Sequence, residues 1–160
     1  MRPAQKDAAA FTTRPHLTEL RLLNLSHNEM THLYGFHFEG LFMLRELYLQ
    51  HNRLVSIAKQ TFNGLSHLTT LYLDNNLLIA FPVWVLGDQL SQLTLSSNQW
   101  QCECEFMRRF HLFVDTNKEA ILDVNNINCT SSHLDRGLSK DQQCTELMPS
   151  NLHSQVLREN

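Results

Sequence analysis

Apolar and polar residues alternate along residues 20–100 in a pattern that occurs four times. Each copy reads Leu, two residues, Leu, one residue, Leu, two residues, Asn, one residue and a final apolar residue. The four copies are Leu20, Leu23, Leu25, Asn28 and Met30; Leu44, Leu47, Leu49, Asn52 and Leu54; Leu68, Leu71, Leu73, Asn76 and Leu78; and Leu90, Leu93, Leu95, Asn98 and Trp100. The asparagines at positions 28, 52, 76 and 98 are therefore 24, 24 and 22 residues apart. An amphipathic helix, with apolar spacing near 3.6 residues, does not explain asparagines that keep this phase.

The paired leucines predict one short strand in each copy. Leu23 and Leu25 are two residues apart, so both side chains point to the same side of a strand and can face a core. A period of this length, with Leu and Asn at these offsets, is typical of leucine-rich repeats, in which each copy forms one coil of a solenoid. We therefore predict an α/β solenoid of about four coils with a parallel concave sheet. A disulfide-bonded C-terminal cap that contains a helix is expected to follow it.

The asparagine and the residues after it predict the turn and the return path of each coil. A side-chain amide both donates and accepts hydrogen bonds, so Asn can satisfy backbone groups in a turn that no neighbouring strand reaches. The return path is expected to bury Leu33, Phe38, Leu41, Ile57, Phe62 and Leu65. Phe38 should stack on Phe62. The third coil departs from the pattern over Phe81–Leu86, where Pro82 suits an irregular return segment before the array ends.

Polar and aromatic residues between the inward leucines are expected to face outward on the concave sheet. They are Leu22, Asn24, Ser26, Glu46, Tyr48, Gln50, Thr70, Tyr72, Asp74, Gln92, Thr94 and Ser96. Parallel strands lie about 4.8 Å apart, so Tyr48 and Tyr72 should be side by side. Because Tyr is enriched at interface hot spots, this pair, with Glu46 and Asp74, is a candidate contact for a protein partner. Simple cross-strand packing of the two rings is the alternative.

A helix is predicted directly after the fourth coil. Five apolar residues fall on one face at helical spacing: Phe106, Met107, Phe110, Phe113 and Val114. This face should cover the exposed end of the core, since an open-ended repeat array needs a cap to stay soluble.

All four cysteines lie behind the repeats, at Cys102, Cys104, Cys129 and Cys144. An even number in this position suggests disulfides formed in an oxidising compartment. The two cysteines of a C-x-C pair do not easily bond to each other. Of the three possible connectivities we therefore predict Cys102 with Cys129 and Cys104 with Cys144. A four-cysteine zinc site is the competing interpretation, but the paired C-x-x-C knuckles of such sites are missing.

Composition and charge narrow the class of function. The chain has 160 residues and a formal net charge of −3, with both signs interspersed, which argues against nucleic acid or an anionic membrane as partner. The acidic residues after Gln101 are interpreted as a solvated face: Glu103, Glu105, Asp115, Glu119 and Asp123. No phosphate-binding glycine loop or His-Glu-x-x-His sequence occurs. We predict neither an enzyme nor a bound cofactor or metal.

Two short sequence features suggest modification or ion binding. Asn24-Leu25-Ser26 and Asn128-Cys129-Thr130 are N-glycosylation sequons. A glycan on Asn24 would stand on the concave face. His27 and His51 occupy equivalent positions in successive coils, which suggests a pH-sensitive or metal-binding pair; the alternative is two histidines that are only solvated on an exposed turn.

The ends of the chain divide it into four predicted segments. Residues 1–16 are an irregular N-terminal segment, 17–98 the repeats, 99–144 the cysteine-rich cap and 145–160 a linker-like tail. Residues 1–15 contain no apolar stretch typical of a signal peptide, and no run approaches the roughly 20 apolar residues of a membrane span. Because the cysteines indicate an extracellular protein, we expect this chain to be part of a longer one. The first coil has no neighbour below it, so we also expect self-association at this end.

Several phrases of the sequence resemble the Toll and Toll-like receptor ectodomains, and in particular the membrane-proximal repeats of the insect long Toll receptors (the 18-wheeler/Tollo group). The phrases are Phe38-Glu39-Gly40-Leu41, Leu44-Arg45-Glu46-Leu47-Tyr48-Leu49-Gln50, Phe81-Pro82-Val83-Trp84 and Asn98-Gln99-Trp100-Gln101-Cys102-Glu103-Cys104-Glu105-Phe106. The resemblance covers about Leu17 to Cys144. Gln99 stands where many such caps have Pro, and the interval from Cys129 to Cys144 is shorter than is typical.

This resemblance implies a receptor ectodomain on the extracellular side of the plasma membrane. Such ectodomains bind protein or microbial ligands or partner receptors, in innate immune or developmental signalling, and form homo- or heterodimers in the full-length receptor. It also suggests the surface around Arg108 and Arg109 as a second contact, because membrane-proximal caps approach each other in the active dimer. The membrane would be reached only through a span absent from this chain. The alternative function is a secreted or matrix leucine-rich repeat protein, acting in adhesion or as a soluble decoy.

Overall fold

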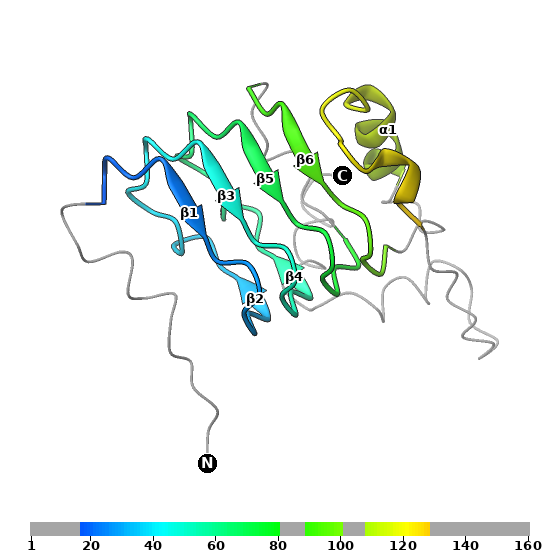
Figure 1. Ribbon diagram of the computed structural model, residues 1–160, viewed down its shortest axis with the longest axis horizontal. Helices are drawn as coiled ribbons and strands as arrows, with labels where there is room; N and C mark the ends of the chain where they lie inside the picture. Colours follow the sequence, from blue (N-terminus) through cyan, green and yellow to red (C-terminus); the bar gives the residue numbers. More distant parts are fainter. Residues whose placement is uncertain (1–16, 81–88, 101–107, 129–160) are drawn as a thin grey trace, which may run out of the picture.

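The computed structural model describes residues 17–80, 89–100 and 108–128. Four short strands form a parallel sheet in the order β1-β3-β5-β6. Their bounds are Leu22–Asn24 for β1, Glu46–Tyr48 for β3, Thr70–Tyr72 for β5 and Gln92–Thr94 for β6. On the return path, β2 (His32–Leu33) pairs in parallel with β4 (Ser56–Ile57). The predicted leucine-rich repeat solenoid with a parallel sheet is thus confirmed (Figure 1).

Two shorter elements follow the sheet. The helix α1 (Arg108–Thr116) lies beside β6, at the end of the sheet opposite β1 (Figure 1). A 3-10 turn, η3 (Val124–Asn126), comes after it. Within the described residues, no helix is both long enough and apolar enough to cross a membrane.

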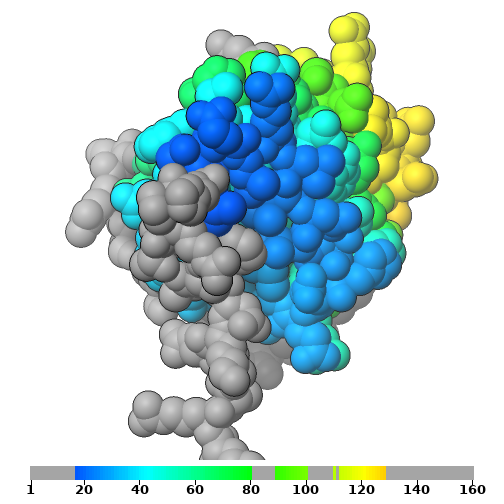
Figure 2. Space-filling view, turned by 60° about the vertical axis from the view of Figure 1, so that its left-hand side comes forward, coloured from blue at the N-terminus to red at the C-terminus, as the bar shows by residue number. Residues whose placement is uncertain are grey.

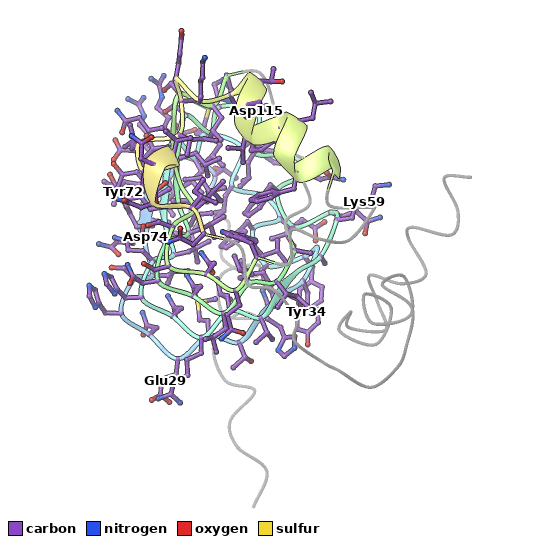
Figure 3. All side chains as sticks on the ribbon, turned by 90° about the vertical axis from the view of Figure 1, so that its right-hand side faces the viewer. Glu29, Tyr34, Lys59, Tyr72, Asp74 and Asp115 are labelled. Atoms are coloured by element: carbon purple, nitrogen blue, oxygen red, sulfur yellow. The ribbon has the colours of Figure 1, made fainter. Side chains whose placement is uncertain are left out.

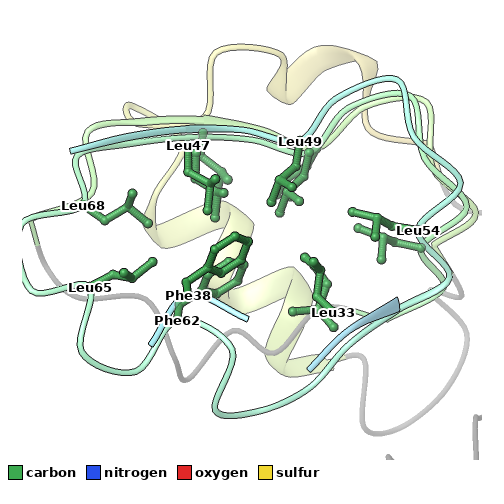
Figure 4. Packing of buried hydrophobic residues seen from close by; sticks show 14 of the residues in the cluster. Leu33, Phe38, Leu47, Leu49, Leu54, Phe62, Leu65 and Leu68 are labelled. Carbon is green, nitrogen blue, oxygen red and sulfur yellow. The ribbon is translucent and has the colours of Figure 1, made fainter. Parts of the chain in front are cut away.

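The core is a stack of equivalent side chains, one from each coil. Leu23, Leu47, Leu71 and Leu93 are in register on neighbouring strands, and the return path places Leu33 opposite Ile57. The rings of Phe38 and Phe62 are stacked as predicted, with centroids 6.3 Å apart and an interplanar angle of 7°. Figure 4 looks into this core, where the leucines of the strands face the two phenylalanines. Burial of these side chains, at about 1.5–3 kcal/mol each, is the main force that holds the coils together.

The asparagines at the turns have the role that the sequence predicted. Asn52 donates from Nδ2 to the carbonyl oxygens of Leu49 at 3.0 Å and Leu25 at 2.9 Å. Its Oδ1 accepts from the backbone N–H of Met30 at 3.0 Å. Asn76 and Asn98 make the same three contacts one and two coils further on. Each of these asparagines therefore joins its own turn to the preceding coil.

The residue before each of the four repeat asparagines, from Asn28 to Asn98, has a left-handed backbone. The φ angles are 56° at His27 and His51, 55° at Asn75 and 53° at Ser97. Residues other than glycine rarely adopt this backbone conformation, because it costs roughly 1–2 kcal/mol. The hydrogen bonds of the asparagine that follows, such as those of Asn52 after His51, stabilise this turn.

The cap closes the solenoid by packing and by extending the sheet. Phe110 of α1 is 3% exposed, and its ring lies 4.8 Å from that of Trp100. Phe113 and Val114 also pack against the core, which confirms the predicted role of the helix, whereas Phe106 and Met107 lie outside the described residues. After α1 the chain returns to β6, where the backbone N–H of Leu93 donates to the carbonyl of Ala120 at 2.8 Å, and that of Leu122 to the carbonyl of Leu93 at 2.9 Å.

The structure corrects one detail of the sequence analysis and refines another. Asp123 does not belong to a merely solvated acidic face, because its carboxylate accepts the backbone N–H groups of Leu95 at 3.0 Å and Ser96 at 2.7 Å. Thr70, expected to face outward, is only 6% exposed. It is a short side chain in register between the longer side chains of Glu46 and Gln92.

Several predicted features lie outside the described residues. They are the N-terminal segment 1–16, the irregular segment Phe81–Leu86, the tail 145–160 and all four cysteines with both proposed disulfides. The first coil forms the end face that is visible in Figure 2. Leu20 and Leu25 are only partly buried there, whereas Leu44 and Leu49 of the second coil are fully buried. Self-association through this end stays a prediction.

Candidate protein-binding surface

The outward positions of the sheet form one row across the four strands. Asn24, Tyr48, Tyr72 and Thr94 are in register on β1, β3, β5 and β6. The rings of Tyr48 and Tyr72 meet edge to face, with centroids 5.1 Å apart and an interplanar angle of 87°. The predicted adjacency of the two tyrosines is confirmed, and this geometry suits the quadrupoles of two aromatic rings. We call Glu46, Tyr48, Tyr72 and Asp74 the concave strip.

Glu46 fixes the hydroxyl group of Tyr48. The hydroxyl donates to Oε2 of Glu46 at 2.7 Å. This hydrogen bond, the burial of the ring, the negative charge of Glu46 and the neighbouring Tyr72 together raise the pKa of Tyr48 to about 12. Tyr48 is therefore a neutral donor at physiological pH, and its ring stands in a fixed orientation on the sheet.

Asp74 is held in a similar way at the other side of the strip. Its carboxylate accepts the hydroxyl of Thr94 and the side-chain amide of Asn75, the latter at 2.8 Å. The Thr94 hydroxyl in turn accepts the backbone N–H of Leu73 at 3.2 Å. The carboxylate is thus tied to β6 and to the backbone, so a partner would meet it already oriented.

The concave strip is negatively charged. Among the residues that the structure describes, neither Glu46 nor Asp74 forms an ion pair, and their hydrogen bonds come from neutral donors. The carboxylate of Asp123 adds a third negative charge where the cap joins β6. Tyr72 and Asp74 project from the side of the molecule opposite Tyr34 and Lys59 (Figure 3). The arrangement can accept basic and aromatic groups of a partner.

The two arginines predicted as a second contact are not part of this strip. Arg108 and Arg109 begin α1, which lies beyond β6, whereas the tyrosines belong to β3 and β5. The side chains of both arginines lie outside the described part of the structure. The tyrosines and the arginines therefore stand as two separate candidates.

The first sequon is accessible on the concave face. Asn24 is exposed, and its Oδ1 accepts the backbone N–H of Ser26 at 3.0 Å and the Ser26 hydroxyl at 2.6 Å. Asn128 is also exposed, but Cys129 and Thr130 of its sequon lie outside the described residues.

The predicted histidine pair is present as a stack. The rings of His27 and His51 lie 4.3 Å apart with an interplanar angle of 11°. The lone pairs of imidazole lie in the plane of the ring, so two parallel rings cannot direct them at one shared ion without rotating. Across residues 17–80, 89–100 and 108–128, no group of three or more His, Cys, Asp or Glu side chains is placed to hold a metal ion.

The sequence analysis missed an aromatic cluster on the return path of the first coil. Tyr34 and Phe36 are 41% and 53% exposed, and their rings are parallel at 6.0 Å. The ring of His37 meets both edge to face, and its Nδ1 accepts the backbone N–H of Tyr34 at 3.2 Å. Burial lowers the pKa of His37, which favours the neutral ring that this contact requires. Aromatic residues at alternate positions from His32 to Phe36 were the available signal.

Comparison with known proteins agrees with this architecture. A comparison with curated protein sequences found no match to the chain. Among solved structures, human 5T4 (Wnt-activated inhibitory factor 1, trophoblast glycoprotein) is similar, with a TM-score of 0.63 and 28% sequence identity. The match covers 73% of this chain and 43% of 5T4, so the chain spans less than half of that protein. The profile of the leucine rich repeat family matches residues 9–54 and 42–99. The chain belongs to the leucine rich repeat family.

Proposed function

We propose that this chain is an extracellular binding domain that recognises a protein partner through the concave strip. Leucine-rich repeat solenoids present extended concave surfaces that bind other molecules. The observation that carries the proposal is the edge-to-face pair of tyrosines beside two hydrogen-bonded carboxylates on the open sheet. Tyr is enriched at interface hot spots, and fixed side chains lose little conformational entropy on binding.

The charge of the strip suggests the chemistry of the partner. Glu46 and Asp74 are negative and face no basic residue in the described part of the sheet. A partner that brings Lys or Arg next to an aromatic or aliphatic group would satisfy the carboxylates and cover the rings. Electrostatic complementarity of this kind raises the association rate and gives specificity.

At a finer level, we propose that the chain is the membrane-proximal ectodomain of a Toll-like receptor, acting in innate immune or developmental signalling as a homo- or heterodimer. The support is the resemblance of the Phe38 and Tyr48 phrases and of the Asn98-Gln99-Trp100 sequence. Arg108 and Arg109 would then contribute to contact between caps.

The second candidate is a secreted inhibitor or decoy. It is favoured by the likeness to 5T4, which is also named Wnt-activated inhibitory factor 1. Such a protein would use the same strip for binding, without signalling.

Cell-surface binding tests the proposal. The chain, secreted as a fusion with an antibody Fc, is applied to a panel of cell lines, and binding is measured by flow cytometry. The double variant Tyr48→Ala/Tyr72→Ala should bind at least about 10-fold more weakly, as expected for a hot spot. The variant Tyr34→Ala, which removes an exposed Tyr on the other side, is the matched control and should bind normally. Equal binding by the double variant and the parent protein would refute the role of the strip.

The two finer functions are separated by a chimera. The chain is joined to the membrane span and cytoplasmic domain of a Toll receptor in reporter cells, and these cells are mixed with the cells that bind the Fc fusion. A receptor ectodomain should activate the reporter, whereas a decoy should bind and leave it silent.

A further inference from the structure

Asn24 occupies the position on the concave face next to the tyrosines. It is exposed, and it lies in register with Tyr48 on the adjacent strand. Neighbouring parallel strands are about 4.8 Å apart, so a group attached to the Asn24 side chain would reach the ring of Tyr48 before any other aromatic ring of the strip.

A glycan on Nδ2 of Asn24 would disturb no hydrogen bond of the described sheet. Both bonds from Ser26 are accepted by Oδ1. Within the described residues Nδ2 has no hydrogen-bond partner, in contrast to the turn asparagines, whose Nδ2 atoms are bound to carbonyl oxygens. The Ser26 hydroxyl that defines the sequon lies 2.6 Å from the Asn24 side chain.

We propose that Asn24 carries an N-linked glycan whose first sugar packs against Tyr48 and covers the β1–β3 half of the concave face. Nδ2 attacks C1 of a lipid diphosphate-linked oligosaccharide and forms the C–N bond. The bond from C1 to the diphosphate oxygen breaks, the lipid diphosphate leaves, and Nδ2 gives up one proton to the oligosaccharyltransferase. The C–H groups of a sugar ring are weakly positive and complement the negative face of an aromatic ring.

The glycan divides the surface that we propose for partner binding, and this consequence rests on that proposal. Tyr48 and Glu46 become covered, while Tyr72, Asp74 and Thr94 stay open toward the cap. The open half is the half where Asp74 is fixed by Thr94 and where Asp123 adds its charge. In the glycosylated chain a basic partner would then bind the concave strip through Tyr72 and Asp74, and removal of the glycan would open Tyr48 and Glu46 to it as well.

The test uses the full chain secreted from eukaryotic cells, with Ser26→Ala to remove the sequon and Ser26→Thr to preserve it. Occupancy of Asn24 is measured by mass spectrometry of glycopeptides. Exposure of each tyrosine is measured by hydroxyl-radical footprinting, because the radical adds to the ring and does not require ionisation. Tyr34, which projects from the other side of the molecule, is the internal control.

We expect Asn24 to be occupied in the parent chain and in Ser26→Thr, and unmodified in Ser26→Ala. Oxidation of Tyr48 should be several-fold slower in the two glycosylated proteins than in Ser26→Ala, with Tyr34 unchanged. An unmodified Asn24 in secreted chain would overturn the inference, and so would occupied Asn24 with unchanged oxidation of Tyr48. Neither result would contradict the proposed function, because that proposal is tested separately by the cell binding of the Tyr48→Ala/Tyr72→Ala variant.

Discussion

At the residue scale, the turn asparagines show how one side chain can serve two coils. Asn76 donates to the carbonyls of Leu49 and Leu73 and accepts from the backbone N–H of Leu54, all of which are buried. Asn28, in the first coil, is exposed, and within the described residues it bonds to the carbonyls of Leu25 and Ser26 in its own coil. The two residues occupy the same position of the repeat, but the described residues include a preceding coil only for Asn76.

Replacing Asn76 by Ala should therefore destabilise the protein by about 3 kcal/mol, because the buried N–H of Leu54 loses its acceptor and two carbonyls each lose a donor. The matched replacement Asn28→Ala should cost only about 1 kcal/mol, since it removes exposed hydrogen bonds alone. The measurement is urea unfolding followed by circular dichroism. Equal losses in the two variants would contradict the proposed link between coils.

The Tyr48–Glu46 pair predicts a pH effect. The pKa of Tyr48 is raised to about 12 in the folded protein, above its ordinary value of 10.0, so the neutral ring stabilises the fold below pH 10. This contribution is lost as the pH rises from 10 to 12. The difference in absorbance at about 295 nm between the parent protein and Tyr48→Phe reports this titration. Glu46→Gln removes the negative charge and should move the pKa of Tyr48 down toward its ordinary value.

At the element scale, the last strand of the sheet is followed in space by residues 121–123, which do not belong to the repeat pattern. Ile121 takes the place of an inward leucine beside Leu93, and Asp123 binds the backbone of Leu95 and Ser96 where a fifth strand would otherwise pair. The edge of the sheet is thereby covered, which protects its open N–H groups from pairing with another chain.

Asp123→Ala should cost about 2 kcal/mol, because two backbone N–H groups lose a charged acceptor. Hydrogen exchange at the amides of Leu95 and Ser96 should become faster, since they would meet water. Asp115→Ala removes an exposed carboxylate from α1 and should change neither stability nor exchange. Unchanged protection of the two amides in Asp123→Ala would show that another group covers this edge.

The four strands could be predicted from the sequence because each inward leucine recurs with its asparagine in phase. The cap could be predicted only in part. The spacing of Phe110, Phe113 and Val114 indicates a helix, but Ile121 and Asp123 occur once and carry no periodic signal. Thr70 was assigned to the correct side of its strand, yet its burial depends on the length of its neighbours Glu46 and Gln92, which the alternation of a strand does not encode.

At the scale of the whole molecule, one continuous core runs from the first coil to the cap. Trp100 is fully buried between them: its Nε1 donates to the carbonyl of Leu95 at 2.8 Å, and its ring meets Phe110.

The adjacency of Tyr48 and Tyr72 followed from the repeat period alone. The hydrogen bonds that orient them depend on Glu46, Asp74 and Thr94, whose partners only the folded structure reveals.

Phe110→Ala should destabilise the protein by about 3 kcal/mol, because it leaves a cavity against Trp100. The last coil should also become accessible, which an increase in the fluorescence of a hydrophobic dye would detect. Leu112→Ala alters the same helix at a side chain that is 67% exposed, and should stay within about 0.5 kcal/mol of the parent protein. If both variants behaved alike, the helix would not be the cover of the core.

The asparagine contacts give the solenoid a direction under mechanical load. Asn52, Asn76 and Asn98 each form hydrogen bonds to the coil before them. When a coil is pulled away at the C-terminal end, the preceding coil therefore loses these hydrogen bonds. When a coil is pulled away at the N-terminal end, the asparagine hydrogen bonds between the later coils stay in place. Loss of the last coil would therefore leave the backbone N–H of Leu78 without its acceptor on Asn98, and α1 and Asp123 stand at that end of the array, where they hold the last coil in place.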